Sequence, residues 1–292
     1  MLRLPGVREI WKLIFQKCRD NQFGLEYHIA LKNTCHSMPL YTHAIVREVP
    51  DAYAECLTLE AIEVPIDVPK AREQHEHFCA ILAGLGLEVT RLEADESLPD
   101  CCFIEDTAVL VDDLAILTNP GAPSRIREVE AVETALHGIK PLAKILPPGT
   151  LDGGDVLIIG KTIYIGLSTR TNEAGIRQFA ALVAPSGYAV VSVPVTGLLH
   201  LKSAVTYLGN GHVILAPAHV DPSFFQEYQL LELSEAEAYC ANCLNVNGTI
   251  LLPEGYEQVK KRIEDLDFPV IELDMSEFKK GDGALTCKAL LY

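Results

Sequence analysis

The stretch Asp155-Val-Leu-Ile-Ile-Gly160-Lys161-Thr-Ile-Tyr-Ile-Gly166 places two apolar runs on either side of a two-residue turn. Apolar runs that flank such a short polar or Gly-containing pair are a strong local signal for a β-hairpin. The same arrangement recurs at residues 107–118, 204–216 and 243–253. We therefore predict four hairpins built from one repeated motif.

Helical and strand-like segments follow the hairpins. Apolar residues recur at helical spacing in four segments, which are residues 124–138, 172–183, 223–233 and 257–266. Strand-like segments return at residues 188–194 and 268–273. The predicted unit is therefore β-β-α-β. The beginning and end of the chain fit this unit less clearly, with a strand at 42–49, a helix at 71–85, a strand at 87–92 and a strand at 283–291.

A repeat of this length is typical of rings or arrays of supersecondary units. About five units would close into a ring if the last strand lay beside the first. We predict an α/β fold of this kind, with strand ends meeting at a central axis. An ordinary open α/β sheet is the alternative that the pattern leaves open.

Composition narrows the classes of function. The 292 residues include 24 Lys and Arg and 40 Asp and Glu, which gives a formal net charge of −16. This balance argues against a nucleic-acid binder, which needs a basic face, and suits a site that attracts a small cation. The longest uncharged stretch, residues 179–201, is interrupted by proline and glycine. We therefore expect no membrane span.

The cysteines and the N-terminal segment bear on location. Nine irregularly spaced cysteines favour a reducing compartment with mostly free thiols. Residues 1–40 carry six basic and three acidic residues, with apolar residues at helical spacing around Trp11. This segment is predicted to be an extension, either a transit or membrane-surface helix or an appendage. Residues 41–292 are predicted to form one domain.

Acidic residues gather just before the hairpin at 107–118. Asp100, Glu105 and Asp106 lie within seven residues of one another, beside the apolar residues 102–104. Buried carboxylates are costly unless they meet a cation, and a guanidinium is their natural planar partner. We interpret this acidic cluster as a binding site for a cationic group; a turn exposed to solvent is the alternative. Because adjacent residues of an extended chain point to opposite sides, Glu105 and Asp106 would face different ways.

Three further residues are candidates for chemistry. Asp152 precedes a Gly-Gly pair, His200 lies at the entrance to the hairpin at 204–216, and Cys287 lies near the C-terminus. A cysteine with a distant histidine and acids is the pattern of a nucleophile, although each residue alone is more commonly structural. Cys240 and Cys243 lack partners at zinc-site spacing. His75 and His77 have the wrong spacing to share a helix face, and we predict them at the surface.

Together these residues resemble the dimethylarginine dimethylaminohydrolase family, of the guanidine-modifying superfamily that includes the arginine deiminases. The resemblance spans residues 42–292 in the family's order. It is carried by residues 94–106, 120–125, 151–157, 166–172, 197–203 and 285–287. The resemblance implies a five-fold pseudo-symmetric α/β propeller, or pentein, of ββαβ units, which agrees with the repeat.

The resemblance also implies roles. Cys287 would be the nucleophile, His200 the general acid and base, and Asp152 the acid that orients His200. The implied substrate ligands are Glu105, Asp106 and Asp282 for the guanidinium, Asp100 and a backbone carbonyl near Leu57 or Thr58 for the α-ammonium, and Arg125 and Arg170 for the α-carboxylate. Gly281 would line the pocket, at a position where the family often has a larger residue.

The implied reaction hydrolyses Nω,Nω-dimethyl- and Nω-monomethyl-L-arginine to L-citrulline and an amine, through a thiouronium on cysteine. No cofactor or metal is implied, although zinc could inhibit at Cys287. The family context implies nitric oxide regulation, a small-molecule partner only, a monomer or homodimer, and a cytoplasmic or, given the basic N-terminal segment, mitochondrial location. A deiminase preferring unmethylated arginine and a non-catalytic binding module are the alternatives.

Overall fold

The computed structural model describes residues 40–292, so the helix predicted near Trp11 lies outside the described residues and the boundary near residue 40 stays a prediction. Within this range, five sheets of three strands each are formed. The strands of four of them are β3 (Ala108–Val111), β4 (Leu114–Leu117) and β5 (Leu142–Lys144); β6 (Val156–Ile159), β7 (Thr162–Leu167) and β8 (Ala189–Pro194); β9 (Val205–Gly209), β10 (His212–Leu215) and β11 (Gln229–Glu232); and β12 (Leu244–Val246), β13 (Thr249–Pro253) and β14 (Val270–Leu273). The fifth is β15 (Leu290–Leu291), β1 (His43–Arg47) and β2 (Glu88–Leu92).

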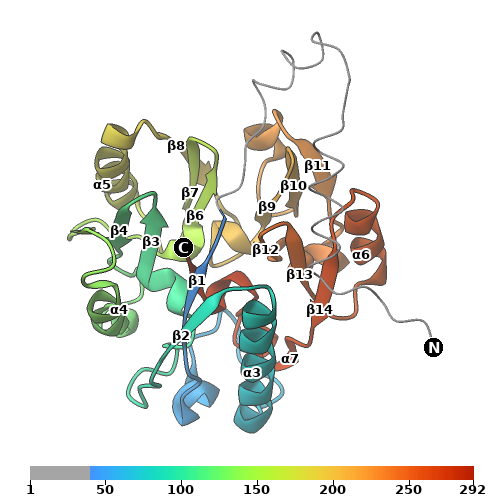
Figure 1. Cartoon of the computed structure of the whole chain (residues 1–292), viewed down its shortest axis with the longest axis horizontal. Helices are drawn as coiled ribbons and strands as arrows, with labels where there is room; N and C mark the ends of the chain where they lie inside the picture. The colour runs from blue at the N-terminus through green and yellow to red at the C-terminus, as the bar shows by residue number, and fades with distance from the viewer. Residues whose placement is uncertain (1–39) are drawn as a thin grey trace. The chain divides into compact units, whose positions relative to one another are not determined.

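All five sheets share one topology, which confirms the predicted repeat. In each, the first strand runs antiparallel to the middle strand, and the middle strand runs parallel to the third. In four of the five sheets, the segment that connects the middle strand to the third contains an α-helix. These helices are α3 (Val68–Gly84), α4 (Glu128–Leu136), α5 (Glu173–Val183) and α6 (Glu257–Glu264). Figure 1 shows these helices on the outer side of their sheets. Buried apolar clusters fill the spaces between neighbouring sheets and helices.

The first strand of every sheet lines one central cavity, so the five sheets surround a common axis. Leu290, Leu110, Leu157, Tyr207 and Asn245 come from β15, β3, β6, β9 and β12 respectively. The last sheet closes the ring, because β1 pairs with β15 near the C-terminus, with Ile45 opposite Leu290. The structure is therefore the five-fold α/β propeller that the sequence predicts, not an open sheet.

Two predicted elements were wrong. Residues 223–233 do not form a helix: a short 3-10 helix (Pro222–Phe225) is followed by β11. Leu231 and Leu233 are buried while Glu232 is exposed, and this alternation is that of a strand. Residues 283–291 are not one strand, because the 3-10 helix η10 (Thr286–Lys288) precedes β15.

His75 was also predicted wrongly, since it is buried on α3, whereas His77 is exposed as expected. His75 lies on the helix face that carries Phe78 and Cys79 into the core, and its Nε2 is 3.6 Å from Cys79 Sγ. Burial lowers the pKa of His75 to about 3. Among residues 40–292, no helix is long and apolar enough to cross a membrane.

Candidate active site

A 3-10 helix precedes the first strand of each sheet, and five of the candidate residues lie in or beside four of these helices. Glu105 and Asp106 belong to η3 (Ile104–Thr107), and Cys287 belongs to η10. Asp152 and His200 are the residues just before η5 (Gly153–Asp155) and η7 (Leu201–Ser203). Because the sheets surround one axis, these equivalent positions bring residues far apart in sequence to the same end of the ring.

His200 lies among carboxylates. Its Nε2 is 2.9 Å from Asp152 Oδ2 and 3.7 Å from Asp106 Oδ1, and all three side chains are buried. Burial opposes the positive charge, but Asp106, the hydrogen bond with Asp152 and the nearby Asp155 outweigh it and raise the pKa of His200 to about 9. His200 is therefore an imidazolium at neutral pH, able to donate a proton.

The Gly-Gly pair after Asp152 allows this close packing. Gly154 N donates a hydrogen bond of 2.9 Å to Asp106 Oδ1. A Cβ at Gly154 would lie 2.8 Å from that same oxygen and 2.8 Å from His200 Cγ. Any side chain at Gly154 would therefore push apart the carboxylate and the imidazole.

Arg125 is almost saturated by protein groups. Its Nε lies 3.1 Å from both Glu128 carboxylate oxygens, Nη1 lies 2.5 Å from Asp106 Oδ2, and Nη2 donates to Phe103 O at 2.9 Å. Burial would raise the pKa of Asp106, but His200 and Arg125 hold it well below its usual range. Arg125 thus keeps Asp106 ionised and oriented, and few of its donors remain for the α-carboxylate that it was predicted to bind.

Arg170, unlike Arg125, has a guanidinium nitrogen from which no group in the described part of the chain accepts a hydrogen bond. Its Nη1 is buried without a hydrogen-bond partner, and the nearest carboxylate oxygen, Asp152 Oδ2, lies 3.9 Å away. A buried guanidinium nitrogen without an acceptor is costly, so this position is suited to an incoming anion.

The other predicted substrate ligands lie around a loop after Tyr53. Asp100 Oδ1 accepts a 3.0 Å hydrogen bond from Leu57 N, and Asp282 Oδ2 accepts one of 2.6 Å from Leu59 N. Asp282 has a left-handed backbone, with φ of 55°. The Thr58 hydroxyl donates to Glu60 O, and Thr58 is not among the residues that line the pocket described below.

Gly281 lines the pocket beneath the same loop. A Cβ at this position would lie 2.7 Å from Tyr53 Oη and 2.9 Å from Cys56 Sγ. Tyr53 and Cys56 therefore occupy the space that a larger residue at 281 would need.

One pocket brings most of these residues together. It is lined by Leu57, Asp100, Phe103, Asp106, Arg125, Arg170, Leu199, His200, Gly281, Asp282, Gly283 and Cys287. Asp152 lies behind it, where its Oδ1 accepts a 2.8 Å hydrogen bond from Gly121 N. We call this cavity the active-site pocket.

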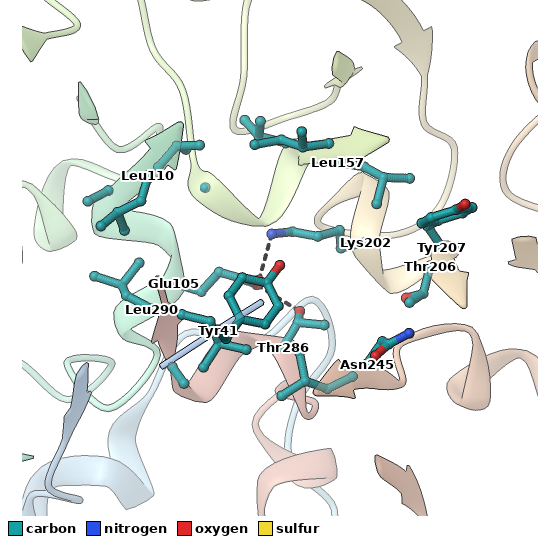
Figure 2. A pocket seen from close by; sticks show the side chains of 18 of the residues that line it. Tyr41, Glu105, Leu110, Leu157, Lys202, Thr206, Tyr207, Asn245, Thr286 and Leu290 are labelled. Atoms are coloured by element: carbon teal, nitrogen blue, oxygen red, sulfur yellow. Dashed lines mark hydrogen bonds and ion pairs between the residues drawn. The ribbon is translucent and has the colours of Figure 1, made fainter. Parts of the chain in front are cut away.

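Glu105 does not reach the active-site pocket. It lines the central cavity instead, where Oε1 lies 2.6 Å from Lys202 Nζ and Oε2 accepts a 2.8 Å hydrogen bond from the Thr286 hydroxyl (Figure 2). Glu105 and Asp106 thus face different cavities, although they lie in a 3-10 helix and not on the extended chain that was predicted. The ion pair and Thr286 place the charge of Glu105 close behind Cys287.

Cys287 is nearly buried, with 8% of its surface exposed. Burial, Glu105 and Asp106 raise the pKa of its thiol to about 12. The free protein therefore holds a thiol, and a cation bound in the pocket would favour the thiolate by offsetting the carboxylates.

Lys288, the next residue, is wholly buried, and its Nζ has no hydrogen-bond partner. The ammonium lies 3.8 Å from the ring centroid of Phe278 and 4.6 Å from that of Phe78. Burial lowers the pKa of Lys288 to about 7. Phe278 belongs to α7 (Ser276–Lys280), which leads directly to Gly281 and Asp282.

Among residues 40–292, Asp106, Asp152 and His200 form the one group whose ligand atoms lie close enough to hold a metal ion. The guanidinium groups of Arg125 and Arg170 lie 2.5 Å and 3.9 Å from the same carboxylates. Positive charge so close to these carboxylates disfavours a divalent cation there. Cys287 is not in the group, so zinc at Cys287 stays a prediction.

Comparison with known proteins agrees with this geometry. The family model described as "N,N dimethylarginine dimethylhydrolase, eukaryotic" matches residues 58–289. The chain is 35% identical over 255 residues to the N(G),N(G)-dimethylarginine dimethylaminohydrolase of Pseudomonas aeruginosa, which covers 87% of this chain and all of that protein. The chain belongs to the dimethylarginine dimethylaminohydrolase family.

Other relatives and solved structures support this membership. The Streptomyces coelicolor protein of the same name is 36% identical over 247 residues, covering 84% of this chain and 94% of that protein. A solved structure of the Pseudomonas aeruginosa enzyme, a cysteine-to-serine mutant complexed with citrulline, superposes with a TM-score of 0.84 at 33% identity, over 87% of this chain and 100% of that chain. The N-terminal domain of ArgZ, a cyanobacterial arginine dihydrolase, shares the fold, with a TM-score of 0.78 at 18% identity over 85% of this chain and 97% of that one.

Sequence reasoning missed several residues of this pocket. Glu128, which holds Arg125, lies three residues further along the chain, and an acid at that spacing from an arginine was a usable signal. Phe103, Leu199 and Gly283 line the pocket; Leu199 and Gly283 are adjacent to predicted residues, and Phe103 lies two residues before Glu105. Lys202 pairs with Glu105, but the two residues precede strands of different sheets. No local pattern in the sequence reveals such a contact.

Proposed function

We propose that this chain hydrolyses Nω,Nω-dimethyl- and Nω-monomethyl-L-arginine to L-citrulline and dimethylamine or methylamine, as a hydrolase of C–N bonds. The observation that carries the proposal is the convergence on one buried pocket of a thiol (Cys287), an imidazolium (His200), an ionised carboxylate (Asp106) and a guanidinium with one nitrogen that lacks a hydrogen-bond acceptor (Arg170). The family relatives named for this activity support it.

The first half of the reaction forms a covalent intermediate. The substrate guanidinium binds beside Asp106, and its charge favours loss of the Cys287 proton to solvent. The thiolate attacks the guanidinium carbon, and the carbon–nitrogen bond to the methylated nitrogen breaks as His200 donates its proton to the departing amine. The products of this half are a thiouronium on Cys287, a neutral His200 and the free amine.

The second half restores the enzyme. Neutral His200 takes a proton from water, and the resulting hydroxide attacks the thiouronium carbon. The carbon–sulfur bond then breaks, the protonated urea that results loses its hydroxyl proton to solvent, and citrulline is released. Cys287 returns as the thiolate, which takes a proton from solvent when citrulline leaves, and His200 returns as the imidazolium. Over the whole cycle, the substrate cation and water give citrulline, the amine and one proton.

The free thiols support a second part of the proposal, which is a reducing compartment. The cysteines of the described chain are all free, namely Cys56, Cys79, Cys101, Cys102, Cys240, Cys243 and Cys287. Such a set of thiols persists where glutathione and thioredoxin keep cysteines reduced.

The deciding experiment compares turnover of Nω,Nω-dimethylarginine with turnover of arginine, by detecting citrulline. Turnover of the methylated substrate with release of dimethylamine supports the proposal. Exclusive turnover of arginine would make the chain a deiminase. Binding without any release of dimethylamine would make it a binding module.

The pH profile follows from the two pKa values. The pKa of Cys287 is about 12 and that of His200 about 9, and the reaction needs a thiolate together with an imidazolium. Below pH 9 the imidazolium is intact while the thiolate fraction rises with pH, so kcat/KM should rise about tenfold per pH unit. Above pH 9 the two fractions change in opposite directions, and kcat/KM should level off. Measuring kcat/KM from roughly pH 6 to pH 10 checks this, and a plateau already at pH 6–7 would contradict it.

Arg170→Ala should weaken kcat/KM for free methylarginine by about ten- to hundredfold, because a charge-assisted hydrogen bond to the α-carboxylate is worth roughly 1.5–3 kcal/mol. Agmatine lacks the carboxylate, so its already low kcat/KM should change far less. Arg177→Ala, at an exposed arginine of α5, is the control and should change neither. Equal fold-losses for both substrates would show that Arg170 is structural.

A further inference from the structure

A second cavity, of about 220 Å³, lies beside the active-site pocket and shares two of its residues, Leu199 and Asp282. We call it the side cavity. Its wall is mostly apolar, with contributions from Leu59, Leu198, Leu199, Ala238 and Ala284. The shared residues make it a neighbour of the active-site pocket, and it opens to solvent where Leu59, Lys279 and Asp282 are exposed.

The side cavity adjoins the segment of chain that carries the proton donor. His200, which protonates the leaving nitrogen, follows directly after Leu198 and Leu199. A proton donor must lie within hydrogen-bond reach of the atom that it protonates. Leu199, the residue before His200, forms part of the wall of both cavities and is therefore the boundary that a group beside the proton donor would meet.

The polar groups in the wall already have partners within the protein. Tyr239 Oη donates a 2.8 Å hydrogen bond to Gly283 O, and Asn242 exchanges hydrogen bonds of 3.1 Å and 3.0 Å with Thr286. Lys279 Nζ lies 4.8 Å from the ring centroid of Tyr239 and 3.1 Å from Tyr256 Oη. Asp282 Oδ2 accepts a hydrogen bond from Leu59 N, so apart from the Ser203 hydroxyl and the second Asp282 oxygen the wall offers a guest mainly leucine and alanine side chains.

We propose that the side cavity receives the N-alkyl substituent of the leaving amine, and that the substrates include Nω-alkyl-L-arginines with alkyl groups longer than methyl. This inference rests on the proposed function, since it assigns a place to one group of the same substrate. Each methylene transferred from water to such a wall favours binding roughly fourfold. This gain in binding free energy offsets the conformational entropy that a longer alkyl substituent loses when it binds.

The test compares Nω-monomethyl- with Nω-propyl-L-arginine, which differ only in two methylene groups. Wild type should process the propyl substrate with a kcat/KM within about tenfold of the monomethyl value, by citrulline detection. Ala238→Leu, which fills the side cavity, should lower kcat/KM at least tenfold for the propyl substrate and less than twofold for the monomethyl substrate. The control is Ala236→Leu, an exposed position on the same 3-10 helix (Glu235–Ala241), and it should alter neither.

Two outcomes would overturn the inference while leaving the proposed function intact. One is a propyl kcat/KM more than a hundredfold below the monomethyl value in wild type. The other is an equal loss for both substrates in Ala238→Leu. If wild type turned over neither methylated arginine nor the propyl substrate, the proposed function itself would fail, and the inference with it.

Discussion

Cys287→Ser should fold normally and lose at least 99% of its turnover of dimethylarginine. Cys287 is the one cysteine in the described residues that lines the active-site pocket. A serine hydroxyl has a far smaller ionised fraction than a thiol, and the carboxylates that raise the pKa of Cys287 would suppress ionisation of serine as well. Citrulline formation measures the loss, and circular dichroism checks the fold.

The matched control for this change is Cys240→Ala. Cys240 is fully buried in the cluster around β12 and β13 and lines none of the cavities discussed above. Its removal should cost some stability but leave kcat/KM within about twofold. More than a few per cent of wild-type turnover in Cys287→Ser would show that another group is the nucleophile.

Lys288→Met should stabilise the protein at neutral and acidic pH. The pKa of Lys288 falls from 10.5 to about 7 on folding. Between these values the unfolded chain holds a proton that the folded chain has lost, so wild-type stability rises with pH across this window. Below pH 7 the cost of the buried ammonium is present in full. The difference in pKa corresponds to at most about 5 kcal/mol, and loss of the contacts with the two rings leaves a net gain of about 2–4 kcal/mol.

Thermal unfolding at pH 6 and at pH 10 measures this effect. The gain in Tm for Lys288→Met should be several degrees at pH 6 and much smaller at pH 10. Lys261→Met, at an exposed lysine, is the control and should change Tm little at either pH. A loss of stability at pH 6 would show that the aromatic rings hold the ammonium more strongly than burial opposes it.

Local chemistry explains why much of the fold was predictable. The hairpin turns at Asn210-Gly211 and Asn247-Gly248 have positive φ at both residues, which asparagine and glycine adopt most readily. Such turns fix where strands pair without reference to the rest of the molecule. Residues 223–233 failed because their apolar spacing fits a helix as well as a strand, and pairing with β10 decides between them.

The site was predictable in identity more than in geometry. The resemblance to a known family pointed to the residues that line the active-site pocket, including His200, Asp106 and Cys287. The orientation of Glu105 depends on Lys202, and the saturation of Arg125 depends on Asp106 as well as on the nearby Glu128. The contacts with Lys202 and Asp106 join residues that are far apart in the sequence, so the local pattern of the chain does not contain them.

The pairing of β1 with β15 has a consequence for the folding pathway. Ile45 and Leu290 are neighbours in a sheet but lie at opposite ends of the described chain, whereas every other strand pair joins segments of one repeat. Contacts of such high sequence separation form late, because the entropy of closing the intervening loop is lost before they contribute. Four repeats would fold locally, and docking of β15 onto β1 would complete the fifth in the slow step. A circular permutant of residues 41–292, joined between Tyr292 and Tyr41 and opened at Asn210-Gly211, would make that contact local and shift the slow step to the new break.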